Sequence, residues 1–367
     1  MSKYIGVMSG TSLDGVDAVL VSIKNDNVEV IKSVSHDFPS DLVNDLKRLL
    51  EEGIISLQKL GEINYRLGLV YANCVNDLIL KAGINSDEVT AIGCHGQTVF
   101  HDPRSKYPFS MQLGDGNVLA AKTGVDAIMD FRGMDIAFGG EGAPLTPAFH
   151  QEFFKEQNEN RVILNLGGIA NVTVLNEDKI LGFDTGPANC LIDLWIQNEL
   201  GKQFDKNGDW ARSGNIHSEL LTHFMNEDYF KLKAPKSTGK ELFNLEWIKE
   251  KLVDFPNISN KDVQATITEL TARSIAEAIH LYASNIDAMY ICGGGAFNLY
   301  LRERLSHYMP KIKISTTSDL GIPEQLVEAV AFAWLAHQRV NELSGNLPSV
   351  TGSGNTAILG CVYKYIG

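Results

Sequence analysis

Long apolar runs are missing from this chain of 367 residues. Crossing a bilayer takes about 20 consecutive apolar residues, and no segment approaches that length. The N-terminus also lacks a basic segment followed by an apolar one, and instead enters a strand-like run almost at once. We therefore expect neither a membrane span nor a secretory leader, and we expect the protein to be cytoplasmic.

Cysteine pairs and basic clusters are missing as well. The five cysteines, Cys74, Cys94, Cys190, Cys292 and Cys361, are scattered and never form a CxxC pair. An odd number of scattered cysteines without a CxxC pair indicates neither a disulfide framework nor a zinc site, so we expect buried free thiols. The formal charge is −13 with no cluster of Lys and Arg, so we expect no nucleic-acid partner.

The familiar nucleotide-binding signatures are also missing. No GxxxxGK[ST] precedes a helix-like segment, because PKSTGK at 235–240 lacks the first glycine at the required spacing and follows no strand. No GxGxxG follows an early strand, and no short repeat or low-complexity segment is present. Any bound phosphate must therefore be held by another arrangement of the backbone.

The elements that the sequence predicts alternate between strands and helices. Helical spacing of apolar residues runs through 41–53 and 57–83, and a strand-like segment followed by a loop covers 89–101. The length favours about two domains. We place them at 1–130 and 131–367, because 130–147 is rich in Gly and Pro and is typical of a crossover between domains.

Two glycine-rich turns open the two halves of the chain. In each, apolar runs flank small and hydroxylic residues, SGTSLDG within 6–19 and LGGIAN within 161–175. Both patterns predict a strand-turn-strand hairpin. Each turn on its own is explained by chain reversal. If the two turns face each other across a cleft, their amides and hydroxyls could together hold a polyphosphate without much positive charge.

Two further segments join a strand to a helix. YICGGGAFN at 290–298 has three glycines that would let a flat adenosine lie against the backbone, although a tight turn explains them equally. GFDTGPANCLIDLW at 182–195 places Asp184 at the end of a short strand and Pro187 in the first turn of a helix. Asp184 is thus either a general base or a cap for that helix.

Taken together, the motifs SGTSLDGVD, CHGQTVFHDP, DFRGMDIAFGGEGAPLTPAFH, LNLGGIANVT, GFDTGPAN and CGGGAFN resemble the anhydro-N-acetylmuramic acid kinase family over essentially the whole chain. The resemblance implies an α/β, two-domain actin/hexokinase/Hsp70-like ATPase fold, in which two ribonuclease-H-like domains surround a cleft. It also implies ATP as a cofactor with Mg²⁺, a small sugar as substrate, a place in peptidoglycan recycling, and a homodimer as a compatible assembly.

The reaction that the resemblance implies is a double one. Water opens the 1,6-anhydro bridge of 1,6-anhydro-N-acetylmuramic acid at C1, and O6 takes the γ-phosphate of ATP, which gives N-acetylmuramic acid 6-phosphate and ADP. A glycosidase needs a second acid to protonate the leaving oxygen. Here phosphoryl transfer captures that oxygen, so one base suffices, and by similarity this base is Asp184.

The other roles carry over residue by residue. The first phosphate hairpin comprises Gly10, Thr11, Ser12, Leu13, Asp14, Gly15, Val16 and Asp17, with Asp14 assisting Mg²⁺ directly or through water. The second hairpin contains Gly167 and Gly168, and the adenosine segment contains Gly293, Gly294, Gly295 and Asn298. The sugar pocket contains Gln97, Thr98, Arg132 and Glu328, with Arg132 pairing with the lactyl carboxylate.

Several alternatives stay open from the sequence alone. Glu328 is also explained as part of a solvated helix face, and His95 and His101 are better explained as structural histidines. A kinase of the same fold could act on an ordinary sugar hydroxyl, with Asp184 deprotonating that hydroxyl. A nucleotide-switched sugar sensor is the alternative from another class, and dependence of ATP turnover on added sugar distinguishes it from an enzyme.

Overall fold

The computed structural model describes residues 2–10, 13–24, 27–176, 180–283 and 285–367. The chain divides into two compact units. Unit 1 comprises Met1–Phe153 together with Leu326–Gly367, and unit 2 comprises Phe154–Gln325.

Unit 1 is built on a six-stranded sheet in the order β13-β7-β4-β1-β2-β3. β2 pairs antiparallel with both β1 and β3, whereas β4 runs parallel to β1 and β7 parallel to β4. The strands are β1 (Ser2–Met8), β2 (Gly15–Lys24), β3 (Asn27–Asp37), β4 (Val89–Cys94), β7 (Ala127–Met129) and β13 (Cys361–Tyr363), and a separate ribbon consists of β5 (Gln97–Asp102) and β6 (Phe109–Leu113).

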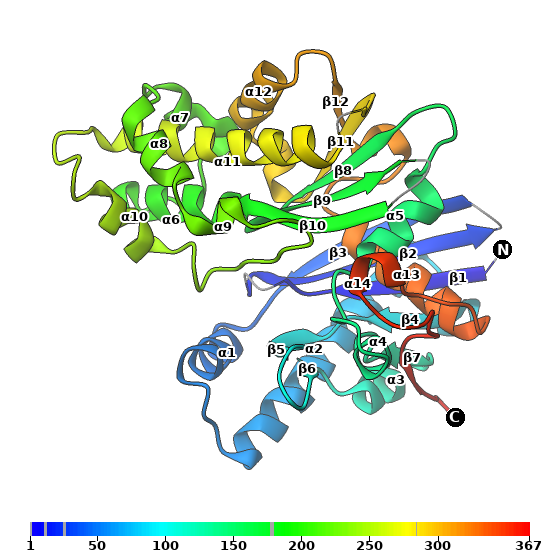
Figure 1. Ribbon diagram of the computed structural model, residues 1–367. Coiled ribbons are helices and arrows are strands. Elements are labelled where there is room, and N and C mark those ends of the chain that lie inside the picture. The colour runs from blue at the N-terminus through cyan, green and yellow to red at the C-terminus, as the bar shows by residue number, and fades with distance from the viewer. Residues whose placement is uncertain (1, 11–12, 25–26, 177–179, 284) are drawn as a thin grey trace. The chain divides into compact units, whose positions relative to one another are not determined.

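Helices cover both faces of this sheet (Figure 1). Alternate residues such as Ile5 and Val7 pack into a core shared with α2. Gly6 and Gly93 point to the opposite face, where a Cβ atom would lie 1.8 and 2.0 Å from backbone oxygens of α13. Glycine is therefore required where α13 crosses the two strands. The helices of unit 1 are α1 (Ser40–Glu52), α2 (Leu57–Ala82), α3 (Gly116–Thr123), α4 (Gly133–Ala137), α5 (Thr146–Phe154), α13 (Val327–Val340) and α14 (Pro348–Thr351).

Unit 2 repeats the same strand plan. Its sheet has the order β10-β9-β8-β11-β12, with β8, β9 and β10 antiparallel in sequence and β11 parallel to both β8 and β12. The strands are β8 (Arg161–Leu166), β9 (Ile169–Leu175), β10 (Ile180–Pro187), β11 (Ala288–Cys292) and β12 (Lys313–Thr316). Three antiparallel strands followed by two parallel ones in each unit confirm the predicted duplicated, ribonuclease-H-like fold class.

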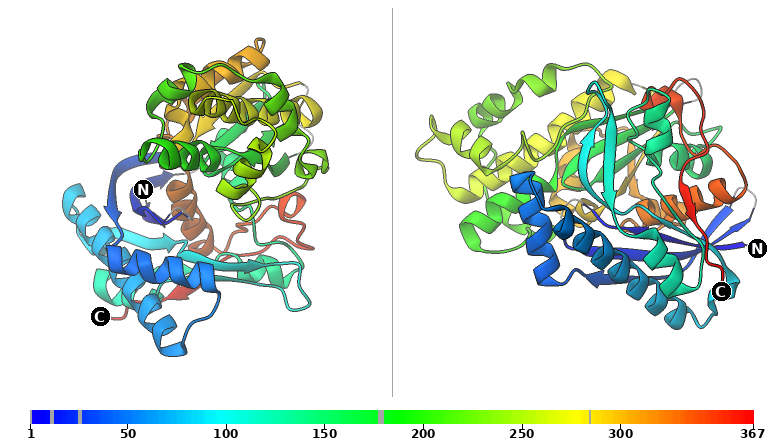
Figure 2. Two further views of the ribbon diagram at one scale, coloured as in Figure 1. Left: turned by 90° about the vertical axis from the view of Figure 1, so that its left-hand side faces the viewer. Right: turned by 90° about the horizontal axis from the view of Figure 1, so that it is seen from below.

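Helices of unit 2 pack on its sheet and on one another, with the long α11 running through their centre (Figure 2). Ala272, Ile275, Ala276 and Ile279 of α11 join the core of the sheet, while Val263, Ile267 and Leu270 join a second core beside α6. The helices are α6 (Asn189–Leu200), α7 (Asp209–Arg212), α8 (Ser218–Met225), α9 (Asp228–Lys231), α10 (Leu245–Leu252), α11 (Asn260–Tyr282) and α12 (Leu299–Tyr308).

The division of the structure differs from the boundary at 130/131 that composition suggested. The segment 130–147 lies inside unit 1, where it contains α4 and the start of α5, and the chain enters unit 2 after Phe153. The chain then returns, because α13 packs on β1, β2 and β4. A local change in composition cannot reveal such a long-range return.

All five cysteines are free. Four of them are buried as predicted, whereas Cys361 is exposed, so the prediction of burial is wrong for that residue. Among the described residues, no helix combines the length and the apolar character that a membrane span requires.

Candidate functional site

The first predicted phosphate hairpin is present as the turn between β1 and β2, whose strands pair as far as Met8 and Asp17. Thr11 and Ser12 lie outside the described residues. Leu13 is buried with φ 61°, a left-handed conformation that a non-glycine residue adopts only in a tightly determined turn. Asp14 follows it and is exposed. The turn therefore presents the Asp14 carboxylate to solvent.

Three other members of the hairpin have structural contacts. Val16 is buried in the core of unit 1. A Cβ on Gly15 would lie 2.3 Å from the carbonyl oxygen of His36, so β3 passes too close for another residue. Asp17 accepts a hydrogen bond from Ser35 at 2.5 Å, and burial raises the pKa of its carboxyl. Gly10 is partly exposed, and its carbonyl accepts a hydrogen bond from Gln97.

Gln97 links the first hairpin to the β5–β6 ribbon. Its side chain is fully buried, and Nε2 donates to the Gly10 carbonyl at 3.2 Å. Its Oε1 has no hydrogen-bond partner within the described part of the chain. A buried acceptor of this kind is costly unless something donates to it. Thr98, the next residue, accepts from Gln112 at 3.2 Å.

Arg132 is the centre of a second polar group in unit 1. Its Nη1 donates to the Gly142 carbonyl at 2.6 Å and its Nη2 lies 2.8 Å from Nε2 of His95. Burial lowers the pKa of Arg132 to about 10, while the carboxylates of Glu328 and Asp135 oppose that effect. The guanidinium therefore remains charged at neutral pH.

His95 and Glu328 complete this polar group. Burial and the Arg132 cation lower the pKa of His95 well below its usual value, so its neutral ring accepts from Arg132, in agreement with the structural role expected of it. Burial raises the pKa of Glu328, with Arg132 opposing and Asp17 adding to the effect. Glu328 is partly buried at the start of α13, which favours a place in this polar group over a solvated helix face. His101 is a ribbon residue whose Nδ1 lies 3.0 Å from the Ser110 hydroxyl.

Asp135 was not identified from the sequence. Its carboxylate is fully buried and accepts from the Gly142 amide at 2.8 Å, the Asn346 amide at 2.7 Å and the Thr351 hydroxyl at 2.8 Å. The Gly142 peptide is thereby held by Asp135 at its N–H and by Arg132 at its carbonyl. Two of these partners lie more than 200 residues away in sequence, so no local pattern could indicate the cluster.

The second predicted hairpin is the turn between β8 and β9 in unit 2. Gly167 and Gly168 occupy it, and their carbonyls accept hydrogen bonds from the first amides around the start of α6, those of Ala188, Asn189 and Cys190, at 3.0–3.1 Å. The turn is therefore fastened to α6. Gly168 is exposed, and a Cβ there would make ordinary contacts with Cε of Lys240 at 3.6 Å and Cβ of Cys190 at 3.8 Å.

Asp184 lies within β10 and not at its end, which corrects the prediction. The strand continues to Pro187, and α6 begins at Asn189 with no side-chain cap. Asp184 therefore does not cap α6, and Pro187 is not in the first turn of that helix. The pairing of β10 with β9 shifts register between Asp184 and Gly186, so the strand is irregular beside the carboxylate.

The carboxylate of Asp184 is held from a distant segment. Its Oδ2 accepts from the Thr238 amide at 3.0 Å, its own amide donates to the Lys236 carbonyl at 2.9 Å, and Tyr229 donates to its carbonyl at 2.7 Å. Burial raises the pKa of Asp184 to about 6; the Thr238 amide opposes that rise and the Glu241 carboxylate adds to it. A carboxylate with a pKa close to the working pH suits a general base.

The triple glycine follows β11 and leads into a short 3₁₀ turn before α12. A Cβ on Gly293, whose φ is 81°, would lie 2.4 Å from Asn165, and one on Gly295 would lie 2.6 Å from the Leu166 side chain. Those two glycines are explained by close packing. Gly294 is exposed and nearly unobstructed, so it is the glycine best able to face a ligand.

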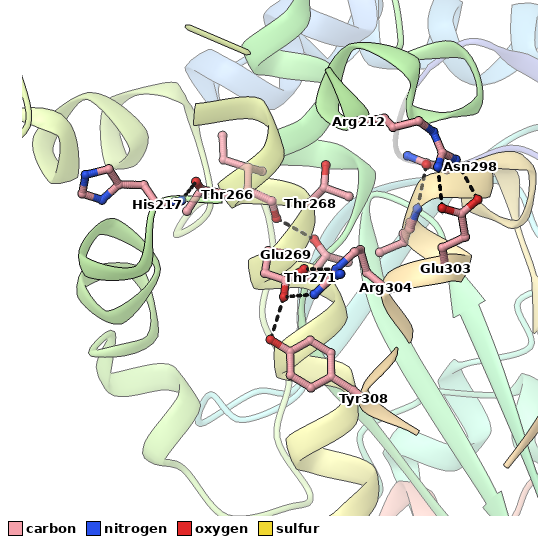
Figure 3. Close-up of polar contacts among 12 residues, drawn as sticks. Arg212, His217, Thr266, Thr268, Glu269, Thr271, Asn298, Glu303, Arg304 and Tyr308 are labelled. Carbon is pink, nitrogen blue, oxygen red and sulfur yellow. Dashed lines mark hydrogen bonds and ion pairs between the residues drawn. The ribbon is translucent and has the colours of Figure 1, made fainter. Parts of the chain in front are cut away.

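Asn298 has a structural role in the described chain. It is buried and its Oδ1 caps α12 by accepting from the Leu301 amide at 3.0 Å. The helix is anchored further along by Arg304, which forms two hydrogen bonds to the buried Glu269 of α11 at 2.6 and 2.8 Å, while Tyr308 donates to the same carboxylate at 2.7 Å (Figure 3).

The same α11 also fixes the end of the strand that carries Asp184. The hydroxyl of Thr271 donates to the Pro187 carbonyl at 3.0 Å. One helix thus supports both the strand of the candidate base and the helix that follows the triple glycine.

Among the described residues, no three His, Cys, Asp or Glu side chains gather as a metal site. Mg²⁺ in nucleotide sites is commonly held by one or two carboxylates together with waters and phosphates. The exposed Asp14 fits that single-carboxylate role.

Comparison with known proteins places these features in context. The family model described as anhydro-N-acetylmuramic acid kinase matches residues 2–365. The anhydro-N-acetylmuramic acid kinase of Pasteurella multocida is 47% identical over 98% of this chain and 96% of its own length, and that of Shewanella halifaxensis is 49% identical over 98% of both. A glucokinase of the ROK family from Streptomyces griseus is a structural neighbour with a TM-score of 0.41 and 14% identity, covering 92% of this chain and 100% of its own.

Proposed function

Since the chain belongs to the anhydro-N-acetylmuramic acid kinase family, we propose that it opens the 1,6-anhydro bridge of 1,6-anhydro-N-acetylmuramic acid with water and phosphorylates O6 from ATP. The observation that carries the chemistry is Asp184, a partly buried carboxylate with a pKa of about 6 and a fixed orientation. The products are N-acetylmuramic acid 6-phosphate and ADP, in the recycling of peptidoglycan.

The bonds in this reaction balance with a single base. Asp184 accepts a proton from water as the water oxygen bonds to C1, and the bond between C1 and O6 breaks. O6 then carries the electron pair and bonds to the γ-phosphorus of ATP, which expels ADP. Because phosphorus captures O6, the leaving oxygen needs no protonating acid, unlike that of an ordinary glycosidase.

The sugar is held by polar groups of unit 1. Arg132 pairs with the lactyl carboxylate, and its orientation by His95 and Gly142 supports this role because a pre-organised guanidinium loses little freedom on binding. Gln97 offers the sugar a buried acceptor, its Oε1, and Thr98 and Glu328 supply further hydrogen-bonding groups.

The nucleotide is held by the two glycine-rich hairpins and the triple glycine. The first hairpin, Gly10 to Asp17, binds phosphate, with Asp14 holding Mg²⁺ directly or through water. Bound Mg²⁺ would neutralise charge on the phosphates. Gly167 and Gly168 bind phosphate from unit 2, and the exposed Gly294 offers the most open place for adenosine among Gly293, Gly294 and Gly295. Asn298 contributes by capping α12.

The partners follow from the reaction. They are a small sugar and ATP, with no nucleic acid or membrane, and the supply of ATP favours the cytoplasm. The family resemblance also favours a homodimer, which sedimentation equilibrium would test.

The test is substrate-dependent product analysis. Purified protein is incubated with Mg-ATP and either the anhydro-sugar or reducing N-acetylmuramic acid, and products are identified by mass spectrometry. We expect ADP and a sugar 6-phosphate to form efficiently only when the anhydro-sugar is supplied. Turnover of the reducing sugar alone would favour the kinase for an ordinary hydroxyl, and ATP turnover independent of sugar would favour the nucleotide-switched alternative.

A further inference from the structure

The segment Pro235–Lys240, which resembles but does not match a phosphate-binding motif, is attached to the strand of the candidate base. The Asp184 amide donates to the Lys236 carbonyl, and the Thr238 amide donates to the Asp184 carboxylate. The Lys236 ammonium lies 4.4 Å from the centre of the Tyr229 ring and donates to the Tyr229 carbonyl. The backbone of this segment is therefore fixed on both sides of Ser237.

Lys240, two residues after Thr238, extends to the second hairpin. Its Cε lies 3.6 Å from the position that a Cβ on Gly168 would occupy. Its charge also reaches the start of α6: burial raises the pKa of the Cys190 thiol to about 12, and the Lys240 ammonium is among the groups that oppose the rise. The geometry thus places the end of the Lys240 side chain beside Gly168, and the direction of its effect on Cys190 agrees with that position.

The ammonium is free to meet a ligand. Lys240 is exposed and forms no ion pair with any residue that the structure describes. The Lys236 ammonium, in contrast, donates a hydrogen bond to the Tyr229 carbonyl. The amides nearest the hairpin are already used, because those of Ala188, Asn189 and Cys190 donate to the carbonyls of Gly167 and Gly168. The start of α6 therefore offers an anion at this turn no free amide from these three residues, and the side chain of Lys240 supplies a cation beside the turn.

We propose that Lys240 is a catalytic residue that contacts the phosphoryl group transferred from ATP. This inference rests on the proposed function, since it takes the second hairpin as a phosphate site. The cation offsets negative charge on the phosphoryl oxygens as the bond to ADP breaks. Thr238 orients the base, so one short segment serves both the attack of water and the capture of O6.

The test compares Lys240→Met and Lys240→Gln with Lys233→Met, a matched change at an exposed lysine seven residues earlier that also forms no ion pair with described residues. Steady-state kinetics give kcat and the KM for each substrate, and calorimetry gives the affinity for the sugar. We expect both Lys240 variants to lose kcat by about 10²-fold, as for loss of one charge-stabilising donor. Sugar affinity should stay within about threefold, and Lys240→Arg should recover part of the activity.

Binding of a non-hydrolysable ATP analogue and of ADP gives a second readout that needs no turnover. A weaker affinity for the analogue with an unchanged affinity for ADP supports a γ-phosphate contact, and a loss of kcat alone supports a contact made in the transition state. The inference is overturned if both Lys240 variants keep kcat and analogue affinity within threefold of the parent, or if Lys233→Met shows the same losses. An inactive parent protein would instead overturn the proposed function and leave the binding comparison to decide on Lys240.

Discussion

Asp184 shows how its surroundings prepare a single side chain for chemistry. Burial favours its neutral form, and the Thr238 amide holds one oxygen in place without returning the pKa to its usual range. These surroundings suit the proposed role, because a base with this pKa is mostly deprotonated at neutral pH and still basic enough to accept a proton from water as it attacks.

The pH dependence of catalysis follows directly from this pKa. Because the base must be deprotonated, kcat/KM for the anhydro-sugar should rise about tenfold per pH unit below pH 6 and level off above it, with an apparent pKa near 6. A pH-rate profile at saturating Mg-ATP measures this. A profile that stays level down to pH 5 would contradict the assignment of Asp184 as the base.

Asp184→Asn should lower the rate of catalysis and raise the stability of the fold. Loss of the base should lower kcat by about 10²–10⁴-fold, with ATP affinity nearly unchanged. The raised pKa means that the folded state favours the protonated carboxyl, so the ionised form costs stability at pH values above it. The Asn variant should thus gain about 1–3 kcal/mol of unfolding free energy at pH 8 and little below pH 4.

The matched control for this substitution is Asp254→Asn, which changes an exposed aspartate of the same unit. It should alter neither kcat nor the free energy of unfolding. An Asp184→Asn protein with near-normal turnover would remove Asp184 from the mechanism.

Sequence motifs identified Asp184, Arg132 and the hairpin glycines, because their local patterns are distinctive. They could not identify the groups that position them. Thr238 is 54 residues from Asp184, and the partners of Asp135 are more than 200 residues away. Asn298 was assigned to the adenosine segment, and only the fold revealed that it caps α12 by accepting a hydrogen bond from the Leu301 amide.

At the scale of elements, α12 is joined to α11 by an ion pair whose carboxylate is buried. Glu269 is 3% exposed and holds both Arg304 and Tyr308. Glu269→Gln should reduce the unfolding free energy by about 2–4 kcal/mol, because the largely buried Arg304 guanidinium loses its charged partner. Chemical denaturation measures this.

The neighbouring pair of Glu303 with Arg212 on α12 and α7 provides a control of the same chemistry. Its side chains are 57% and 42% exposed, so Glu303→Gln should cost under about 1 kcal/mol. Equal losses for the two substitutions would show that burial does not set the strength of these pairs.

The packing of α13 on the sheet of unit 1 makes a second prediction at this scale. A Cβ on Gly93 would lie 2.0 Å from the Phe332 carbonyl oxygen. Gly93→Ala should therefore destabilise the protein by about 2 kcal/mol or more, since backbone must move to relieve the overlap. Gly61→Ala, within α2 and with nothing within 4 Å, should instead stabilise by about 0.5–1 kcal/mol. Thermal unfolding of both variants decides it, and a neutral Gly93→Ala would contradict this packing.

Elements with strong local signals were predicted well. The two hairpins follow from glycine and hydroxyl residues between apolar runs, and α2 ends at Gly83 with φ 66° as its sequence indicates. The end of β10 was misplaced because Pro187 suits either a helix start or a strand end, and pairing with Ile169 of β9 selected the strand.

At the scale of the whole molecule, duplication of the fold was predictable and the division of the chain was not. The repeated hairpins signalled two copies of one strand plan, which both sheets confirm. The return of Leu326–Gly367 to unit 1 depends on contacts between α13 and strands more than 230 residues earlier. Local sequence patterns do not indicate these contacts.

The central claim is that water attacks C1 while the former bridge oxygen receives the phosphate. Incubation of the protein with Mg-ATP and 1,6-anhydro-N-acetylmuramic acid in ¹⁸O-labelled water, followed by mass spectrometry of the product fragments, tests it directly. Because the anomeric hydroxyl exchanges slowly with solvent, a matched sample of unlabelled product in the same water corrects for exchange. The account predicts ¹⁸O at the anomeric position at early times and an unlabelled phosphate ester oxygen. Label in the ester oxygen would contradict it.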